Sequence, residues 1–144
     1  MLTLLLSLAL VRPLAGEASH ATAHRPPVTG SYRLRRGRDA GCWLQAAAVG
    51  ADSVRLQLAC SRGAPSYNSG LLAQRLALRS GVAVYATTEF GDRCVIRVRF
   101  RDSRALVEQT GTDAACGFGF GVYAGGTYTR TSRRTPPFDL DPSQ

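Results

Sequence analysis

The feature that most constrains the fold is an alternation of apolar and polar side chains in segments 54–60 and 94–101. Alternation with period 2 is typical of a β-strand that has one buried and one solvated face. The residues that share the apolar faces are Val54, Leu56, Leu58 and Cys60 in the first segment, and Cys94, Ile96, Val98 and Phe100 in the second. The opposite faces carry Arg55 and Gln57 in the first segment, and Arg97, Arg99 and Arg101 in the second. The pattern predicts an antiparallel sheet curled around a single core.

Six further segments are typical of short strands, and Gly, Asp, Ser or Asn stands at nearly every junction. The eight candidates are 31–36, 43–49, 54–60, 71–78, 82–88, 94–101, 105–110 and 127–131. Eight strands in chain order predict an all-β fold, a small antiparallel barrel or a strongly twisted sheet. Segment 71–78 also has an apolar spacing that fits a short helix.

The length of 144 residues is that of one domain. Residues 2–11 form an apolar run too short to span a bilayer but suited to a signal peptide, and Ala21-Thr22-Ala23 offers a cleavage site. No cationic segment precedes the run, so either Met1 is not the true start or the signal is atypical. We predict a signal peptide over 1–23, a linker over 24–29, a barrel over 30–131 and a disordered tail over 132–144. The mature chain is then periplasmic or secreted, with no transmembrane segment.

Four cysteines in a short exported chain indicate two disulfides, with three possible connectivities. The midpoint of Cys42 and Cys60 falls on residue 51, inside a turn-like Gly-Ala-Asp sequence, so a hairpin folded there places the two opposite each other. Cys94 and Cys116 bracket a second pair of strands. We therefore predict the pairs Cys42–Cys60 and Cys94–Cys116. A zinc site or redox pair is disfavoured because the chain has no C-x-x-C motif.

The sequence offers little for catalysis. Its two histidines, His20 and His24, precede the first predicted strand, which excludes a histidine-based triad or a histidine-ligated metal inside the domain. Glu108 is the only carboxylate within a predicted strand, so a paired-carboxylate glycosidase site has little support. We expect a binding protein and not an enzyme, with no cofactor and no metal.

Two loops are candidates for binding. Segment 61–70 contains Gly, Pro, Asn and Ser beside one aromatic residue and follows a predicted disulfide, so it could present Tyr67, Asn68 and Ser69 to a partner. Alternatively, it is a plain turn whose tyrosine packs over the barrel end. Segment 115–126 carries Phe118 and Phe120 between glycines. Its spacing does not fit a nucleotide-binding loop, and its aromatic residues could instead cap the core.

All 18 basic residues are arginine, against 10 acidic residues, which gives a net charge of +8. Arg33, Arg35, Arg97, Arg99 and Arg101 fall on outward strand faces and could form a basic wall. Such a wall could bind polyanions such as cell-wall polymers or lipopolysaccharide. It could equally be a solvated surface. Export and the lack of a recognition motif argue against nucleic acid.

Several motifs together resemble a family of small exported bacterial β-proteins that end in a strand, a CGFG-type loop and a G-T-Y strand. The motifs are GSYRL, GCWLQ, RGAPSYNSG, VAVYATTEFGDRCVIRVRF and VEQTGTDAACGFGFGVYAGGTY. The resemblance spans about residues 30–130 and rests mainly on Cys94, Cys116, 117–119 and 125–128. It implies the fold and brings no settled activity.

More remotely, the chain is similar to the membrane-bound or periplasmic inhibitors of C-type lysozyme. In that family a Ser-Gly-x-x-Tyr loop and a loop with a Lys-Gly pair enter the enzyme's cleft. The loose counterparts are Ser61-Arg62-Gly63 with Tyr67, and Arg79-Ser80-Gly81. The spacing differs, the chain has no lysine, and it is cationic, as C-type lysozymes are. An anionic hydrolase or toxin would be a better partner.

These features predict an exported binding module of the cell envelope that inhibits a hydrolase or toxin. The alternatives are an arginine-rich polyanion binder and a structural envelope protein without a ligand.

Overall fold

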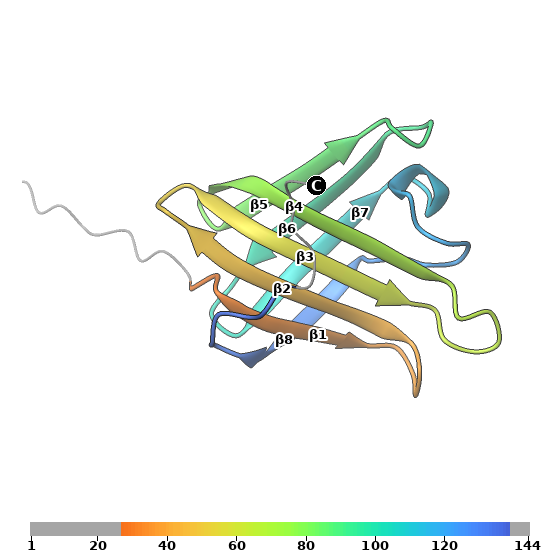
Figure 1. Cartoon of the computed structure of the whole chain (residues 1–144), viewed down its shortest axis with the longest axis horizontal. Coiled ribbons are helices and arrows are strands. Elements are labelled where there is room, and N and C mark those ends of the chain that lie inside the picture. Colours follow the sequence, from red (N-terminus) through yellow and green to blue (C-terminus); the bar gives the residue numbers. More distant parts are fainter. Residues whose placement is uncertain (1–26, 139–144) are drawn as a thin grey trace, which may run out of the picture.

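Residues 27–138 are described by a computed structural model, in which eight antiparallel strands close into a barrel (Figure 1). The elements are β1 (Gly30–Arg35), β2 (Gly41–Val49), β3 (Ser53–Ser61), β4 (Ser69–Arg79), β5 (Val82–Thr87), β6 (Cys94–Phe100), β7 (Arg104–Thr110), the 3₁₀ helix η1 (Ala114–Cys116) and β8 (Gly126–Ser132). Each strand pairs with the next, and β8 pairs back with β1. The predicted antiparallel barrel is confirmed, and segment 71–78 belongs to a strand.

The core lies inside the barrel and follows the alternation of the sequence, because the apolar faces of 54–60 and 94–100 both point inward. Its two largest fully buried side chains are Tyr32 and Tyr128. Their hydroxyls donate to the carbonyl oxygens of Val28 and Ala124, each at 2.7 Å. Burial raises the pKa of both phenols. Both polar tips are thus satisfied within the core, where an unpaired hydroxyl would be costly.

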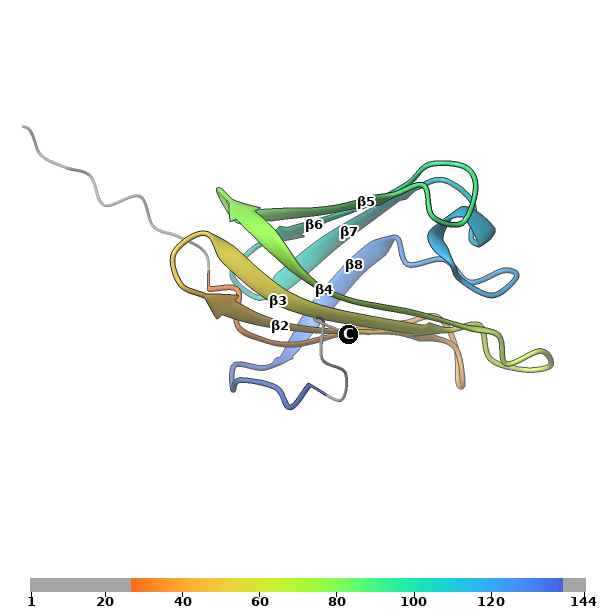
Figure 2. The same ribbon diagram turned by 45° about the horizontal axis from the view of Figure 1, so that its top comes forward.

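The pairing around the barrel is uneven. β3 and β4 are paired without interruption from Ser53↔Ala77 to Ser61↔Ser69. β4 and β5 share only the pairs Leu78↔Ala83 and Arg79↔Val82, next to their connecting turn. Figure 2 shows β4 running away from β5 beyond this turn. The barrel therefore has one weakly joined seam.

The connections divide the barrel into two unlike ends. At one end, which we call the loop end, lie segments 36–40, 62–68, 88–93 and 111–125. At the other, the turn end, lie the short turns 50–52, 80–81 and 101–103. Both disulfides, Cys42–Cys60 and Cys94–Cys116, sit at the loop end and match the predicted pairing. Cys42 lies directly opposite Cys60 in the β2–β3 ladder, as the midpoint argument requires.

The predicted signal peptide (1–23) and the first linker residues (24–26) lie outside the described residues. The first residues of the predicted disordered tail (132–144) differ from that prediction. Ser132 still belongs to β8, and Pro136 is buried. The guanidinium of Arg55 lies 4.4 Å from the centroid of the Phe138 ring, so residues 133–138 fold back over the outer face of β3. From residue 27 to residue 138, no helix is long and apolar enough to cross a membrane.

Candidate functional site

The two loops proposed for binding, 61–70 and 115–126, meet at the loop end, where Figures 1 and 2 show them side by side. The amide of Gly119 donates to the carbonyl of Ser69 at 2.9 Å, so the second loop continues the edge of β4. The side-chain amide of Asn68 donates to the carbonyl of Phe120 at 2.8 Å. Arg62 donates to the same carbonyl at 3.4 Å, and its guanidinium lies 5.5 Å from the ring centroid of Phe120. The loops thus form one surface.

Phe118 is buried and Phe120 is exposed, because a turn begins between them at Gly119. The amide of Val122 donates to the carbonyl of Gly119, which closes a turn with Phe120 and Gly121 in its centre. Gly121 has a φ of 76°, a value that such a turn requires and that favours glycine. Phe120 therefore points outward and is 77% exposed.

Phe118, in contrast, is buried against Gly70, where a Cβ atom would come within 2.4 Å of the phenylalanine ring. Phe118 caps the core, as the alternative interpretation of the loop expected. It is not available to a partner in this structure, which corrects its inclusion among the candidate binding residues.

A single carboxylate holds the outward turn in place. Asp113 accepts the amide of Ala114 on Oδ1 at 2.7 Å and the amide of Gly121 on Oδ2. These two hydrogen bonds, the one from Gly121 first, lower the pKa of Asp113 below its usual range. Asp113 therefore positions the turn that carries Phe120.

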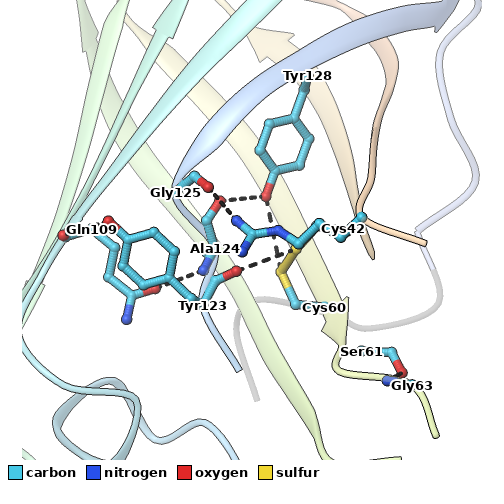
Figure 3. The surroundings of a disulfide bond; sticks show 10 residues. Cys42, Cys60, Ser61, Gly63, Gln109, Tyr123, Ala124, Gly125 and Tyr128 are labelled. Carbon is cyan, nitrogen blue, oxygen red and sulfur yellow. Dashed lines mark hydrogen bonds between the residues drawn. A yellow bond between two sulfur atoms is a disulfide. The ribbon is translucent and has the colours of Figure 1, made fainter. Parts of the chain in front are cut away.

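The Cys42–Cys60 disulfide lies beside Tyr123 and Tyr128, as Figure 3 shows. The sulfur of Cys42 lies 3.7 Å from the carbonyl oxygen of Tyr123, and the sulfur of Cys60 lies 3.9 Å from the Tyr128 hydroxyl. The buried side chain of Gln109 accepts the amide of Ala124 at 2.8 Å. The end of the 111–125 segment is therefore hydrogen-bonded to β7 and packs against the disulfide.

Four aromatic side chains are exposed at this end, and together with Arg62 we call them the loop-end surface. They are Tyr67, Phe90, Phe120 and Tyr123, with exposed fractions of 62%, 51%, 77% and 47%. Phe90 lies against Gly117, where a Cβ atom would come within 2.6 Å of its ring. Tyr67 has a φ of 50°, which is strained for a residue with a side chain. Strain of this kind clusters at binding sites.

Sequence reasoning located this surface only in part. Tyr67 and Phe120 are exposed, as predicted. The Asn68 side chain instead donates a hydrogen bond to the Phe120 carbonyl, and Ser69 is the first residue of β4. Arg62, Phe90 and Tyr123 were not among the candidates. The Gly- and Pro-rich composition that marked the two loops could have drawn attention to Tyr123, but nothing local marked Phe90.

The basic face predicted from the sequence divides into two groups. Arg33 and Arg35 lie on β1, while Arg97 and Arg99 lie on β6 and Arg101 directly follows it. β7 and β8 separate the groups. The two groups therefore lie three strand spacings apart, which is about 14 Å along the wall of the barrel.

The two segments that carry the likeness to lysozyme inhibitors lie at opposite ends of the barrel. Residues 61–63 and Tyr67 are at the loop end, while the turn at 80–81 is at the turn end. β4 spans the distance between them, about 34 Å for a strand of this length. These segments could not enter a single cleft together.

Comparison with family models, with curated proteins and with solved structures gives no match. In residues 27–138, no three side chains of His, Cys, Asp or Glu gather where they could hold a metal ion. The geometry of the site is therefore what bears on function.

Proposed function

We propose that this chain is an exported binding module that recognises a partner protein through its loop-end surface and inhibits that partner, a secreted or envelope hydrolase or toxin. The observation that carries the proposal is the state of Phe120. Its side chain is 77% exposed, while its own carbonyl is held by Asn68 and Arg62 from the neighbouring loop. A large apolar side chain presented on a fixed backbone is suited to fill a pocket of a partner.

The shape of the loop end supports a cleft as the complementary surface. In Figures 1 and 2 the β3–β4 loop, which carries Tyr67, projects past the end of the barrel beside the 111–125 segment. Aromatic residues and arginine are the residue types enriched at the centre of protein interfaces. The net charge of +8 favours a partner of negative charge, because opposite charges speed association and like charges oppose it.

The two disulfides support a site of action outside the cytoplasm, because disulfides persist in oxidising compartments. The apolar run at 2–11 supports export through a cleaved signal peptide. Expression of the full chain in a bacterium, followed by fractionation and mass measurement, tests this part. A processed, oxidised protein outside the cytoplasm is expected, and an unprocessed cytoplasmic protein would contradict it.

The interaction is tested with the oxidised mature protein immobilised and exposed to envelope extract at low and at physiological salt. A protein retained at both salts is purified, and its activity and affinity are then measured against variants. The double variant Tyr67→Ala/Phe120→Ala is expected to weaken binding and inhibition at least 30-fold, the usual size of an interface hot spot. Val84→Ala is the matched apolar control, because Val84 is 43% exposed on β5 and away from the loop end.

The charge-reversal variants Arg33→Glu/Arg35→Glu and Arg97→Glu/Arg99→Glu, one for each group of the basic face, separate this proposal from the polyanion alternative. Each should change affinity for the partner protein less than threefold. If either abolished binding while Tyr67→Ala/Phe120→Ala had no effect, the loop-end proposal would be wrong.

A further inference from the structure

The outer face of the β1–β8 pair carries a hollow of about 430 Å³ that is separate from the loop-end surface. Besides Leu34, the lining consists of two residues with a guanidinium group and three with a hydroxyl group. They are Arg33, Arg35, Thr127, Thr129 and Thr131. Every second residue of β8 contributes a threonine, because alternate side chains of a strand share one face. The barrel is thus closed by a strand whose outer face is a row of hydroxyls.

The hollow is strongly electropositive. β1, β2 and β8 contain no acidic residue, and Glu108 on β7 is the one acidic residue within the described strands. Neither Arg33 nor Arg35 is paired with a carboxylate in the described part of the chain. Their charges are therefore available to an anion from outside.

The side chains around the hollow are aligned across four strands. Trp43 lies opposite Arg33, Arg33 opposite Thr129, and Thr129 opposite Arg104. The guanidinium of Arg33 lies 5.0 Å from the centroid of the Trp43 ring. Stacking on an aromatic face leaves the N–H edges of a guanidinium free to bind oxygen atoms. The row spans about 14 Å from Trp43 to Arg104, at the usual spacing of strands.

A second hollow of about 330 Å³ extends the surface on the far side of β1, and Thr131 lines both hollows. Its lining includes Ser31, Trp43 and Gln45. The combined surface offers guanidinium, hydroxyl and amide groups around one flat indole. Sugars present to a protein the complementary groups, namely hydroxyls along the edges of a ring and an apolar ring face.

We propose that this face binds an acidic polysaccharide. Arg33, Arg35 and Arg104 take its carboxylate or sulfate groups through charge-assisted hydrogen bonds. Thr127 and Thr129 bond its hydroxyls, and Trp43 lies against a sugar ring. Single-stranded nucleic acid is disfavoured because it is bound by several aromatic platforms in succession. Trp43 is the one aromatic residue at an outward position in the described strands.

Tryptophan fluorescence reports on this face alone, because Trp43 is the only tryptophan of the chain. The oxidised mature protein is titrated with polygalacturonate, which carries carboxylates, and with dextran sulfate, while Trp43 fluorescence is recorded. Neutral dextran is the uncharged control. Binding of at least one acidic polymer is expected, weakening as salt rises from 20 to 150 mM, with no response to dextran. No response to either acidic polymer at 20 mM salt would overturn the proposal.

Variants then locate the site. Their binding is measured with fluorescently labelled polymer instead of Trp43 fluorescence, because changes at Arg33 alter the surroundings of Trp43. Arg33→Glu/Arg35→Glu should weaken binding at least tenfold, and Thr129→Val about threefold. The matched control Arg97→Glu/Arg99→Glu carries the same change in charge and should weaken binding less than threefold. Equal losses in both double variants would show attraction by net charge alone and overturn the site.

Two further measurements complete the test. An oligo(dT) strand of equal charge is expected to bind at least tenfold more weakly than the better polysaccharide, and equal or tighter binding would contradict the polysaccharide assignment. The thermal unfolding midpoint of each variant confirms that it is folded. The proposal is independent of the loop-end function, because Tyr67→Ala/Phe120→Ala should leave polymer binding unchanged.

Discussion

The two ends of the barrel are held together in different ways. At the turn end each of the turns 50–52, 80–81 and 101–103 accepts one backbone hydrogen bond from a neighbouring strand, and within residues 27–138 no hydrogen bond joins one of these turns to another. At the loop end the connections are joined to one another, since Asn68 reaches Phe120 and Gly117 lies under Phe90. Both disulfides also lie there. The difference teaches that this protein concentrates long-range restraints where its connections are long, and so keeps an aromatic surface in a fixed shape.

The largest expected effect is loss of a disulfide at the loop end. Replacing Cys94 and Cys116 by alanine should lower the free energy of unfolding by about 3 kcal/mol, the value for a closed loop of this size. Urea denaturation measures the loss. Amide exchange should then rise throughout 111–125 while the turn at 80–81 keeps its protection. A uniform rise at both ends would contradict the comparison.

The second effect concerns the contact between Gly70 and Phe118. Gly70→Ala should destabilise the protein by about 1–3 kcal/mol, because the added Cβ would overlap the buried ring. Gly37→Ala is the matched control, since a Cβ there meets nothing within 4 Å, and its effect should stay within about 0.5 kcal/mol. Thermal unfolding compares the two. Similar values for both variants would refute the role of Gly70 in packing the loop end.

The third prediction uses acid to release the turn around Phe120. The pKa of Asp113 is lowered in the folded protein, so its contribution to stability is full above the ordinary carboxyl pKa of about 3.9. The contribution is lost as the pH falls through the lower, folded-state pKa. The amide shifts of Ala114 and Gly121 should therefore move together as the pH is lowered below the ordinary carboxyl pKa. Asp113→Asn should abolish this transition, whereas Asp52→Asn at the turn end should leave it intact.

The smallest effect compares two residues with positive φ, one at each end. Tyr67 and Ser80 have φ values of 50° and 48°, where asparagine is better tolerated than either. Ser80→Asn should stabilise the protein by about 0.5 kcal/mol without other consequence. Tyr67→Asn should give a similar gain in thermal stability but weaken partner binding. If Tyr67→Asn bound the partner as tightly as the parent, the strain at Tyr67 would have no function.

Much of the fold follows from short-range pattern. The alternation around Leu56 and Ile96 predicts the strands and their buried faces, and the turn midway between Cys42 and Cys60 predicts the register that places these two opposite each other. Segment 71–78 was ambiguous because its apolar spacing fits two periods. Its continuous pairing with β3 decides the matter, and such pairing between separate segments is not encoded locally.

The candidate site was less predictable for the same reason. Phe118 and Phe120 stand in identical G-F-G surroundings, and only the turn closed by Val122 sends one inward and the other outward. Arg62 and Asn68 reach the Phe120 carbonyl from more than fifty residues away along the chain. Composition marks such loops, but it does not say which of their side chains remain exposed.

The short pairing between β4 and β5 leaves a length of β4 that a strand of another molecule could extend, as happens in edge-to-edge aggregation. Arg75 lies in the middle of that length and is exposed. Two copies that met antiparallel about this point would place like charges face to face. Arg75 is therefore placed to oppose pairing of this part of β4 with a second copy of the chain.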